Sequence, residues 1–338
     1  MKSWHLTMGA GLSGLVQREH AVPEPGPGEV LLRVRAASLN YRELMILQQG
    51  RYPLPVKPDV IGLCDGACEV IALGAGATRV APGERVVASI FPHWIDGAFS
   101  FERAAQLGGS LDGMLTEYAV LPEAALVAVP PHLSDEEAAA LPCAGVTAWN
   151  ALSGGAAPLQ SGDDVLVLGS GGVALAALQL AKAAGARVIA TTSSAAKAER
   201  LRELGADAVI DHVATPQWSA EVRRLTGGAG VRHVIETGGS TLAQSLKAVA
   251  LGGEIAFVGT LGGAAATLDA GAVFAAGATL RPIAAGSRTQ LAAVARTVAV
   301  NRLRPPIDRV FGFDDAPAAF AHYARGGNLG KIVIRVAS

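Results

Sequence analysis

From residue 164 onward, short apolar runs rich in Val and Ile alternate with longer segments that mix apolar and polar residues. The short runs predict strands, and the longer segments predict helices. The expected strands cover residues 164–168, 187–191, 208–211, 231–235 and 254–258. The expected helices between them cover residues 172–184, 195–204, 218–225 and 242–249. Strands that alternate with helices in this way predict a parallel sheet with helices on both faces.

The first 120 residues have a different pattern. Val30, Leu32, Val34 and Ala36 alternate with other residues after a Pro/Gly turn, which predicts a strand with one buried face. Further short strands are expected at residues 66–72, 85–88 and 113–120. Short strands separated by Gly and Pro predict a small barrel-like domain.

Two further features complete the expected elements. Ser134 and Glu137 have the spacing of a capping box, which predicts a helix start, and a second helix is expected after Pro142. The last part of the chain predicts helices at 290–300 and 316–324 and a strand at 331–336.

A glycine-rich turn follows the apolar run at 164–168. Gly169, Gly171 and Ala174 match the dinucleotide-binding pattern G-x-G-x-x-G/A. The first glycine permits the tight turn, the second lets backbone amides approach a pyrophosphate, and the small third residue lets the helix pack on the strand. The helix N-terminus then offers free N–H groups to the phosphates. Strand, turn, helix and second strand all occur in the required order, so we expect a nucleotide site.

The end of the second strand of this unit suggests which nucleotide binds. NAD-binding proteins usually carry an acidic residue there, which holds the ribose 2′-hydroxyl. This chain has Thr192, Ser193 and Ser194 instead, followed by Lys197. Hydroxyls and a cation suit a 2′-phosphate, so NADP(H) is preferred and NAD(H) remains possible. The alternative is that Ser194 only caps the next helix and that Lys197 is a solvated charge.

Composition limits the class of protein. The chain has 338 residues, half of them hydrophobic, and 41 glycines, which fits an α/β enzyme of two domains. The net charge is −1 and there is no basic run, so no nucleic-acid partner is expected. We expect no signal peptide and no membrane span, because the longest uncharged stretches are broken by glycines and polar residues. Three cysteines, an odd number, suggest reduced thiols and a cytoplasmic protein.

Taken in order, several motifs resemble those of the medium-chain dehydrogenase/reductase superfamily, over nearly the whole chain. The resemblance is closest to zinc-free members that are quinone-oxidoreductase-like and often labelled alcohol dehydrogenases. The motifs that carry it are Ser38–Glu43, Pro82–Val86, Leu141–Asn150, the glycine turn and Asn328–Ile334.

The resemblance implies an α/β fold with three parts. A GroES-like β-barrel catalytic domain is expected at residues 1–125, and a Rossmann domain with a doubly wound parallel sheet at 126–283. A C-terminal segment, 284–338, is expected to return to the catalytic domain. The resemblance also implies a homodimer that continues the Rossmann sheet across a two-fold axis.

Zinc-dependent members need two thiolates and an imidazole around the metal. Motif alignment places these positions at Asn40, Leu63 and Cys143, of which only Cys143 could bind zinc. The region 89–109, which corresponds to the structural zinc lobe, has no cysteine. Cys64 and Cys68 are expected to have no nearby partner and to be small buried residues. We therefore expect no zinc.

Without zinc, the protein must supply hydrogen-bond donors and a proton. The resemblance places Asn40 near the nicotinamide, where its amide can donate. The segment Gln49–Tyr52 is similar to a Q-G-x-Y sequence whose Tyr is the proposed proton donor in related enoyl reductases. Tyr52 is thus the expected acid, and Tyr41 is a second phenol that could act or shape the pocket.

The remaining candidate cofactor contacts are also implied by the resemblance, and each could instead be only a turn. They are Thr147, Gly172, Val173, Gly238, Gly259, Thr260, Leu261, Ser287, Arg288 and Asn328.

The sequence therefore predicts an NADPH-dependent oxidoreductase that transfers hydride to a small conjugated or carbonyl acceptor. Quinones, enones, enals and aldehydes all fit. One alternative is a zinc-independent alcohol dehydrogenase working in the oxidative direction. Another is a non-catalytic NADPH-binding sensor or partner subunit.

Overall fold

The computed structural model describes residues 1–49, 52–259 and 268–336. It divides into two compact units. Unit 1 contains residues 1–146 and 286–338, and unit 2 contains residues 147–285. The expected boundary at residue 125 lies earlier in the chain. The difference arises because β8 (Leu126–Ala128) pairs with β6 (Arg85–Ala88) and so stays with the strands of unit 1.

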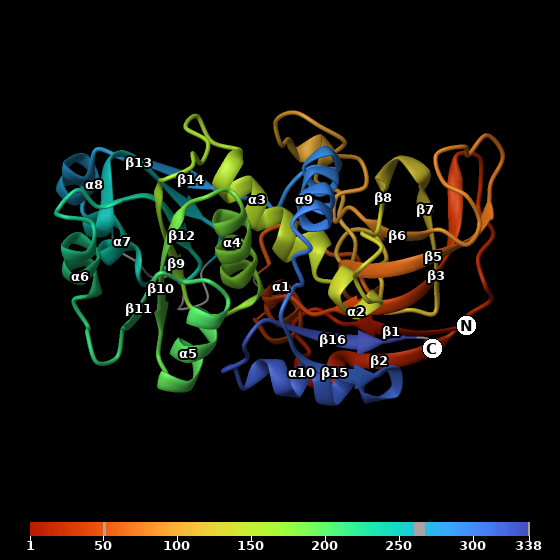
Figure 1. The fold of residues 1–338 in the computed structure, drawn as a ribbon. Coiled ribbons are helices and arrows are strands. Elements are labelled where there is room, and N and C mark those ends of the chain that lie inside the picture. Colours follow the sequence, from red (N-terminus) through yellow and green to blue (C-terminus); the bar gives the residue numbers. More distant parts are fainter. Residues whose placement is uncertain (50–51, 260–267, 337–338) are drawn as a thin grey trace. The chain divides into compact units, whose positions relative to one another are not determined.

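Unit 2 is a six-stranded parallel sheet in the order β11-β10-β9-β12-β13-β14 (Figure 1). The strands are β9 (Asp164–Leu168), β10 (Arg187–Thr192), β11 (Ala208–Asp211), β12 (Val231–Glu236), β13 (Val249–Phe257) and β14 (Thr279–Pro282). The helices are α3 (Val146–Ser153), α4 (Gly172–Ala183), α5 (Ala195–Glu203), α6 (Trp218–Leu225), α7 (Leu242–Ala248) and α8 (Ala270–Ala276).

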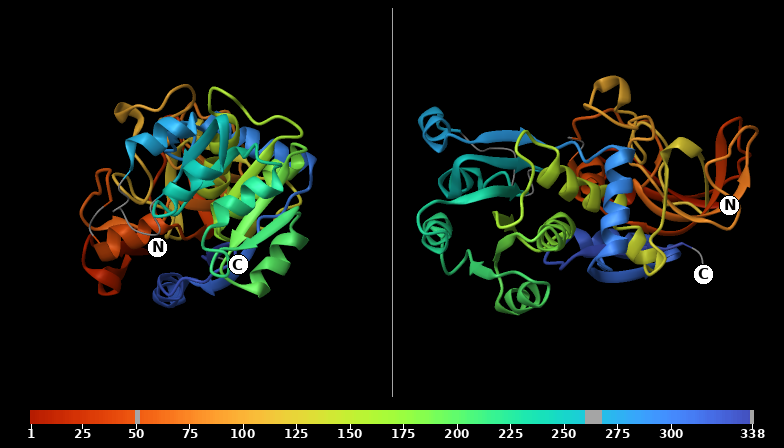
Figure 2. Two further views of the ribbon diagram at one scale, coloured as in Figure 1. Left: turned by 90° about the vertical axis from the view of Figure 1, so that its left-hand side faces the viewer. Right: turned by 45° about the horizontal axis from the view of Figure 1, so that its top comes forward.

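The connections of this sheet reverse direction at β9. From β9 the chain moves through α4 and α5 to β10 and β11, and then returns through α6 to β12 on the other side of β9. The helices consequently cover both faces, with α4 and α5 on one face and α6 and α7 on the other (Figures 1 and 2). This is the doubly wound sheet that the alternating pattern predicts.

The apolar runs form strands because the sheet is covered on both faces. Val165, Leu166 and Val167 are all fully buried, as a central parallel strand requires. Trp218 and Val222 of α6 pack into the same core cluster as Leu166. The short runs are thus continuous rather than alternating because neither of their faces meets water.

Unit 1 is built from two sheets. One is three-stranded in the order β2-β1-β4, and the other is seven-stranded with the path β15-β16-β3-β5-β6-β8, with β7 pairing on β3. The remaining strands of this unit are β1 (Lys2–Leu6), β2 (Leu15–Glu19), β3 (Glu29–Ser38), β4 (Val60–Ile61), β5 (Asp65–Leu73), β7 (Tyr118–Pro122), β15 (Ile307–Gly312) and β16 (Lys331–Arg335). The fold class, a GroES-like domain with a Rossmann-like parallel sheet, is confirmed.

The alternation in β3 is confirmed, since Val30, Leu32, Val34 and Ala36 are all fully buried. β16, close to the end of the described chain, pairs antiparallel with the end of β3, where Val333 lies opposite Ser38. The first and last parts of the sequence are therefore neighbours in unit 1.

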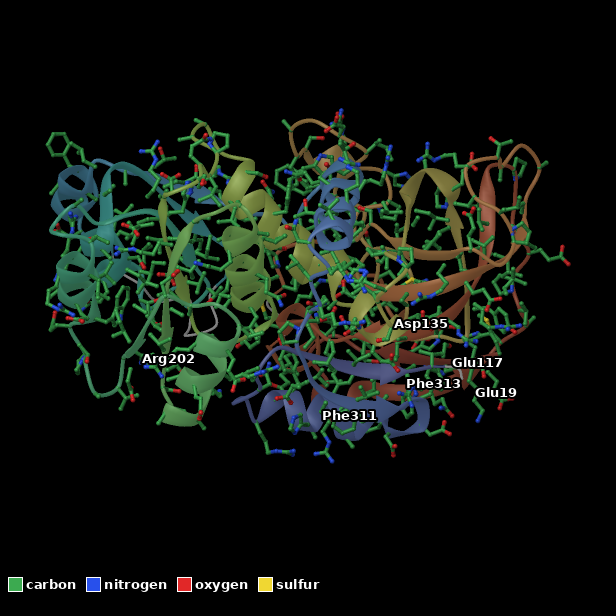
Figure 3. All side chains as sticks on the ribbon, in the orientation of Figure 1. Glu19, Glu117, Asp135, Arg202, Phe311 and Phe313 are labelled. Carbon is green, nitrogen blue, oxygen red and sulfur yellow. The ribbon has the colours of Figure 1, made fainter. Side chains whose placement is uncertain are left out.

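Short helices connect the strands of unit 1. They are η1 (Gly11–Gly14), α1 (Tyr41–Leu44), η2 (Met45–Gln49), η3 (Phe101–Arg103), η4 (Glu123–Ala125), α2 (Asp135–Ala138), η5 (Leu141–Gly145), α9 (Arg288–Val300), η6 (Phe313–Asp315) and α10 (Ala316–Ala324). The capping box at Ser134 and Glu137 is confirmed at the start of α2. Asp135, labelled in Figure 3, begins this helix and accepts a hydrogen bond from Arg85 Nη2 at 2.6 Å. Within the described ranges, no helix is both long enough and apolar enough to cross a bilayer.

Candidate active site

The glycine turn of unit 2 lies at the carboxyl end of β9, where the sheet reverses direction. Gly169 has a φ of +82°, a conformation that disfavours side chains, and its N–H donates to Thr191 Oγ1 at 3.2 Å. Gly171 is the N-cap of α4. A Cβ placed on Gly169 or Gly171 would meet no atom within 4 Å, so the backbone of the turn is open to a ligand. Gly172 and Val173 begin α4, and their N–H groups belong to the first turn of a twelve-residue helix.

The end of β10 carries hydroxyl groups and no acid. Thr192 is buried, and its Oγ1 accepts a hydrogen bond from Ser194 N at 3.3 Å. Ser193 is exposed and Ser194 is half-buried. Ser194 precedes α5, but its side chain makes no capping hydrogen bond. The Ser194 hydroxyl is therefore not used to cap α5.

Three cations lie on α5, Lys197 in its first turn and Arg200 and Arg202 in its last turn. Lys197 is half-buried and forms no ion pair within the part of the chain that the structure describes. Arg200, one turn later, is exposed, and its Nη1 lies 2.6 Å from Glu203 Oε2. Lys197, in the first turn of α5, is therefore a cation close to the end of β10 that no ion pair of the described residues engages.

Glu236, the last residue of β12, organises the neighbouring loop. Its side chain is fully buried, and Oε1 accepts from the N–H groups of Gly238 and Gly239 at 2.8 and 3.1 Å. The hydroxyls of Thr241 and Ser245 each donate to its carboxylate at 2.6 Å. The carboxylate thus fixes the loop at the strand end, beside the strand that carries the glycine turn.

Four other cofactor residues are expected in unit 2: Thr147, Gly259, Thr260 and Leu261. Thr147 is buried on α3. Gly259 follows β13 and is half-buried. Thr260 and Leu261 lie outside the described residues. Gly169, Thr192, Gly238 and Gly259 thus all follow or end strands at the carboxyl edge of one sheet.

Three expected cofactor residues belong to unit 1. Ser287 is buried and caps α9, where its Oγ accepts from Gln290 N at 3.2 Å. Arg288 Nε is buried and has no hydrogen-bond partner within the described residues. Asn328 Nδ2 donates to Gly330 O at 2.8 Å. Of the three, Ser287 has a structural role that its sequence position did not reveal.

Asn40 lies at the centre of a polar cluster in unit 1. Its Oδ1 accepts from Lys331 Nζ at 2.5 Å, and its Nδ2 donates to Asp65 Oδ2 at 2.9 Å. Because an ammonium can only donate and an ionised carboxylate can only accept, these partners fix the orientation of the amide. The second N–H of Nδ2 makes only a long contact of 3.4 Å to Cys64 Sγ.

The charges of this cluster are buried and paired. Asp65 is fully buried, and its Oδ2 also accepts from Ser38 Oγ at 2.8 Å and from Lys331 Nζ at 3.2 Å. Lys331 makes a third contact to Leu39 O at 2.6 Å, so all three of its N–H donors have acceptors. Neither Asp65 nor Lys331 was expected as a site residue.

Cys64 does have a partner, which corrects the sequence-based expectation. Cys64 Sγ, a carboxylate oxygen of Asp65 and Cys143 Sγ all lie within 4.8 Å of one another. Cys64, rather than Leu63, therefore faces Cys143 and Asn40. Leu63, where motif alignment places the zinc-ligand position, has a φ of +61° just before β5.

The same three residues are the only group in the described ranges with the side chains and spacing to hold a metal ion. Two thiols and a carboxylate are chemically possible zinc ligands. The carboxylate of Asp65, however, already accepts three hydrogen bonds at Oδ2, and the Lys331 ammonium compensates its charge. The donor set therefore fits zinc poorly.

Tyr52 is half-buried beside a guanidinium. Its hydroxyl donates to Gln106 Oε1 at 2.7 Å and accepts from Arg42 Nε at 3.2 Å. Arg42 Cζ also lies 4.9 Å from the centre of the Tyr52 ring. Burial raises the pKa of Tyr52 above 10, and the cation of Arg42 partly opposes this shift.

Unit 1 has three other tyrosines, of which Tyr118 begins β7 and stacks against Arg33. Tyr41 is half-buried at the start of α1. Tyr323 of α10 is half-buried, and its pKa is raised by burial and by the nearby charges of Glu43, Cys143, Tyr41 and Asp65. Sequence reasoning missed Tyr323 because nothing in its local sequence relates α10 to a cluster formed by the first part of the chain.

The doubly wound sheet with an open glycine turn at its reversal point, together with the barrel-like unit, defines a nicotinamide-dependent oxidoreductase. Family models agree along most of the chain. Residues 26–131 match the alcohol dehydrogenase GroES-like domain, and residues 172–299 match the zinc-binding dehydrogenase family. The chain belongs to the medium-chain dehydrogenase/reductase superfamily and is an NAD(P)H-dependent oxidoreductase.

Relatives of known name support this placement. A zinc-type alcohol dehydrogenase-like protein of Schizosaccharomyces pombe is 39% identical over 335 residues, which are 97% of this chain and 96% of the relative. The acryloyl-coenzyme A reductase of Metallosphaera sedula is 37% identical over 259 residues, which are 73% of this chain and 74% of that enzyme.

Solved structures show the same fold. An NAD-dependent alcohol dehydrogenase has a TM-score of 0.87 and 34% identity, with both chains covered completely. A mycobacterial protein complexed with NADPH has a TM-score of 0.82 and 27% identity, covering 99% of this chain and all of that one. One neighbour is described as NAD-dependent and the other is complexed with NADPH, so the preference of this chain must be argued from its own residues.

Proposed function

We propose that the protein is an NADPH-dependent reductase that transfers hydride to a small conjugated or carbonyl acceptor without zinc. The observation that carries this proposal is the end of β10. There the strand ends in Thr192, Ser193 and Ser194, with no carboxylate, and Lys197 follows on α5.

These residues suit a 2′-phosphate. The hydroxyl of Ser194 is not used for capping, and Lys197 forms no ion pair within the described residues. A dianionic phosphate would gain charge-assisted hydrogen bonds from both, together with the N-terminal end of α5. A ribose 2′-hydroxyl would find no acidic acceptor there.

The polar cluster of unit 1 supports a reductive role. When bound, reduced nicotinamide supplies the hydride. The negative charge that then develops on the acceptor oxygen needs a donor, and the Asn40 N–H that contacts only Cys64 is available for it. Lys331 Nζ donates to Asn40 Oδ1, which keeps Nδ2 directed toward Cys64 and Asp65. The acryloyl-coenzyme A reductase among the relatives supports a conjugated acceptor.

Tyr52 is the proposed source of the proton that completes the reduction. Its hydroxyl is neutral at physiological pH, because burial raises its pKa above 10. Once the proton leaves, Arg42 Nε still donates to the phenolate oxygen and stabilises its charge. Tyr41 and Tyr323 are the other phenols whose replacement tests this assignment.

The cofactor proposal is tested by titrating the purified protein with NADPH and with NADH and following nicotinamide fluorescence. We expect NADPH to bind at least about tenfold more tightly, a difference of about 1.4 kcal/mol. Equal affinity, or tighter binding of NADH, would show that Ser193, Ser194 and Lys197 form only a helix start. Metal analysis of the same sample tests zinc independence, since one zinc per chain would contradict it.

We also propose a homodimer. Within the described residues β14 is the outermost strand of its sheet, and two large apolar side chains nearby are exposed, Phe274 at 90% and Leu251 at 82%. A second copy that continues the sheet would cover them. Light scattering should give twice the chain mass for the wild type and one chain mass for Phe274→Asp. The control is Phe101→Asp, which changes an equally exposed residue, 87%, of unit 1.

A further inference from the structure

Cys64 and Cys143 come from distant parts of the sequence and meet in unit 1. Cys64 directly precedes β5, and Cys143 lies in η5. Their Sγ atoms lie within 4.8 Å of each other. A disulfide requires the two sulfur atoms to approach to about 2.05 Å, so the pair must move closer together to form one.

The two thiols differ in their exposure. Cys64 is fully buried, whereas Cys143 is half-buried. A small oxidant therefore meets Cys143 first, and Cys64 lies beside it as a second thiol. This is the arrangement of an oxidisable thiol next to a resolving thiol.

We propose that Cys64 and Cys143 form a dithiol site that a hydroperoxide oxidises to a disulfide. In the first step the Cys143 thiolate attacks one oxygen of hydrogen peroxide, the O–O bond breaks, and a sulfenic acid and hydroxide form. In the second step Cys64 sulfur attacks the Cys143 sulfur, the S–O bond breaks, and the S–S bond forms. The Cys64 proton leaves with the hydroxide as water. The two thiols lose two electrons, and the peroxide gains them.

The neighbours of the pair suit the second step. Asp65 Oδ1 lies 3.5 Å from Cys64 Sγ and accepts its S–H, so the carboxylate can take this proton as the sulfur attacks and pass it to the leaving hydroxide. Asn40 Nδ2 donates to the same sulfur at 3.4 Å. Forming the disulfide removes the S–H donor to Asp65 and moves the sulfur that Asn40 contacts.

Oxidation of the two thiols would therefore alter the position of Asn40, whose N–H is the proposed hydrogen-bond donor to the oxygen of the substrate. The chemistry of the two thiols does not depend on the proposed reductase function, and only its effect on turnover does. Mass and thiol measurements can therefore succeed or fail separately from an activity assay.

The experiment treats the whole reduced protein with a small excess of hydrogen peroxide, followed by thiol counting and intact mass. We expect two of the three thiols to disappear with the loss of two hydrogen atoms and no added oxygen. Peptide mapping should join Cys64 to Cys143. Three remaining thiols, added oxygen on Cys143 alone, or a bond that includes Cys68 would overturn the proposal.

Cys68→Ser is the matched control, because Cys68 lies in β5, is buried and is not part of the pair. This variant should form the same disulfide. Cys64→Ser should stop at an oxygen-bearing Cys143, and Cys143→Ser should leave Cys64 reduced. Circular dichroism confirms that each variant is folded, and the wild-type measurement stands even if one variant is not.

The activity arm uses the acceptor that the wild type reduces. Oxidised protein should turn over at least about tenfold more slowly, and a thiol reductant should restore the rate. If the disulfide forms but turnover is unchanged, the pair is a modification site without control over Asn40, and the proposed coupling is wrong.

Discussion

Lys331 Nζ lies 3.2 Å from Asp65 Oδ2, and both side chains are buried. Lys331 begins β16 and Asp65 begins β5, two strands that lie on either side of β3. The pair therefore places a fixed positive charge beside Asn40, in the same cluster as the two thiols.

Replacing Lys331 should destabilise the fold strongly. Lys331→Met leaves the buried carboxylate of Asp65 without its cation, at an expected cost of about 3–5 kcal/mol. Urea unfolding measures this loss. The double variant Lys331→Met with Asp65→Asn removes both charges and should recover much of it. If the double variant is no more stable than the single one, the two residues are not energetically coupled.

Replacing Lys197 should lower affinity for NADPH only. Lys197→Ala removes one charge-assisted hydrogen bond to the 2′-phosphate. We therefore expect the dissociation constant for NADPH to rise about tenfold, a loss of about 1.4 kcal/mol in binding free energy. NADH, which lacks that phosphate, should bind as before. Arg200→Ala is the control, because Arg200 pairs with Glu203 and should matter much less. Equal losses of affinity for NADPH and NADH would show that Lys197 does not contact the 2′-phosphate.

His233 should make stability depend on pH. It is buried in β12, neither ring nitrogen has a hydrogen-bond partner within the described residues, and burial lowers its pKa below 6.5. Below pH 6.5 the unfolded chain therefore binds a proton that the folded chain does not, and stability falls as the pH falls. His233→Leu removes this effect.

Denaturant unfolding of both proteins from pH 8 to pH 5 tests the His233 prediction. The stability of the variant relative to the wild type should increase as the pH decreases through 6.5. Asp163 Oδ2, 3.8 Å from Nε2, opposes the shift only in part. A constant difference between the two proteins over this range would show that His233 titrates as it does in the unfolded chain.

Tyr52→Phe should separate proton donation from packing. If the phenol supplies the proton, turnover should fall by about 10²-fold or more, with little change in cofactor affinity. The ring can keep its contact with Arg42, so the protein should stay folded. Tyr41→Phe and Tyr323→Phe are made in parallel. If only Tyr323→Phe loses turnover, Tyr323 rather than Tyr52 is the proton donor.

The cofactor half of the fold could be predicted from sequence because its signals are local. β9, β11 and α6 begin and end at the predicted residues, and α4 begins at the predicted residue and ends one residue earlier. A strand buried on both faces is encoded by an unbroken apolar run in the sequence. A helix start is marked there by a glycine or by a residue with a hydroxyl group. β13 begins earlier than expected, at Val249, because Gly252 and Gly253 do not interrupt the strand.

The cluster of unit 1 could not be predicted in the same way because it is assembled from distant segments. Asp65 and Lys331 are separated by most of the chain and meet only because β5 and β16 flank β3. The pairing of Cys64 with Cys143 depends likewise on where η5 packs, which no local pattern encodes. Ser287 caps α9 through a local contact with Gln290, and its expected contact with the cofactor stays a prediction.

The central claim is that this chain reduces a conjugated or carbonyl acceptor with NADPH and without zinc. The most direct test incubates chelator-treated protein, shown by metal analysis to be free of zinc, with NADPH and a panel of quinones, enones, enals and aldehydes. We predict NADPH oxidation that requires an acceptor, matches the reduced product mole for mole, and is unchanged by chelation. NADPH that binds but is not consumed with any acceptor, or turnover that returns only when zinc is added, would contradict the claim.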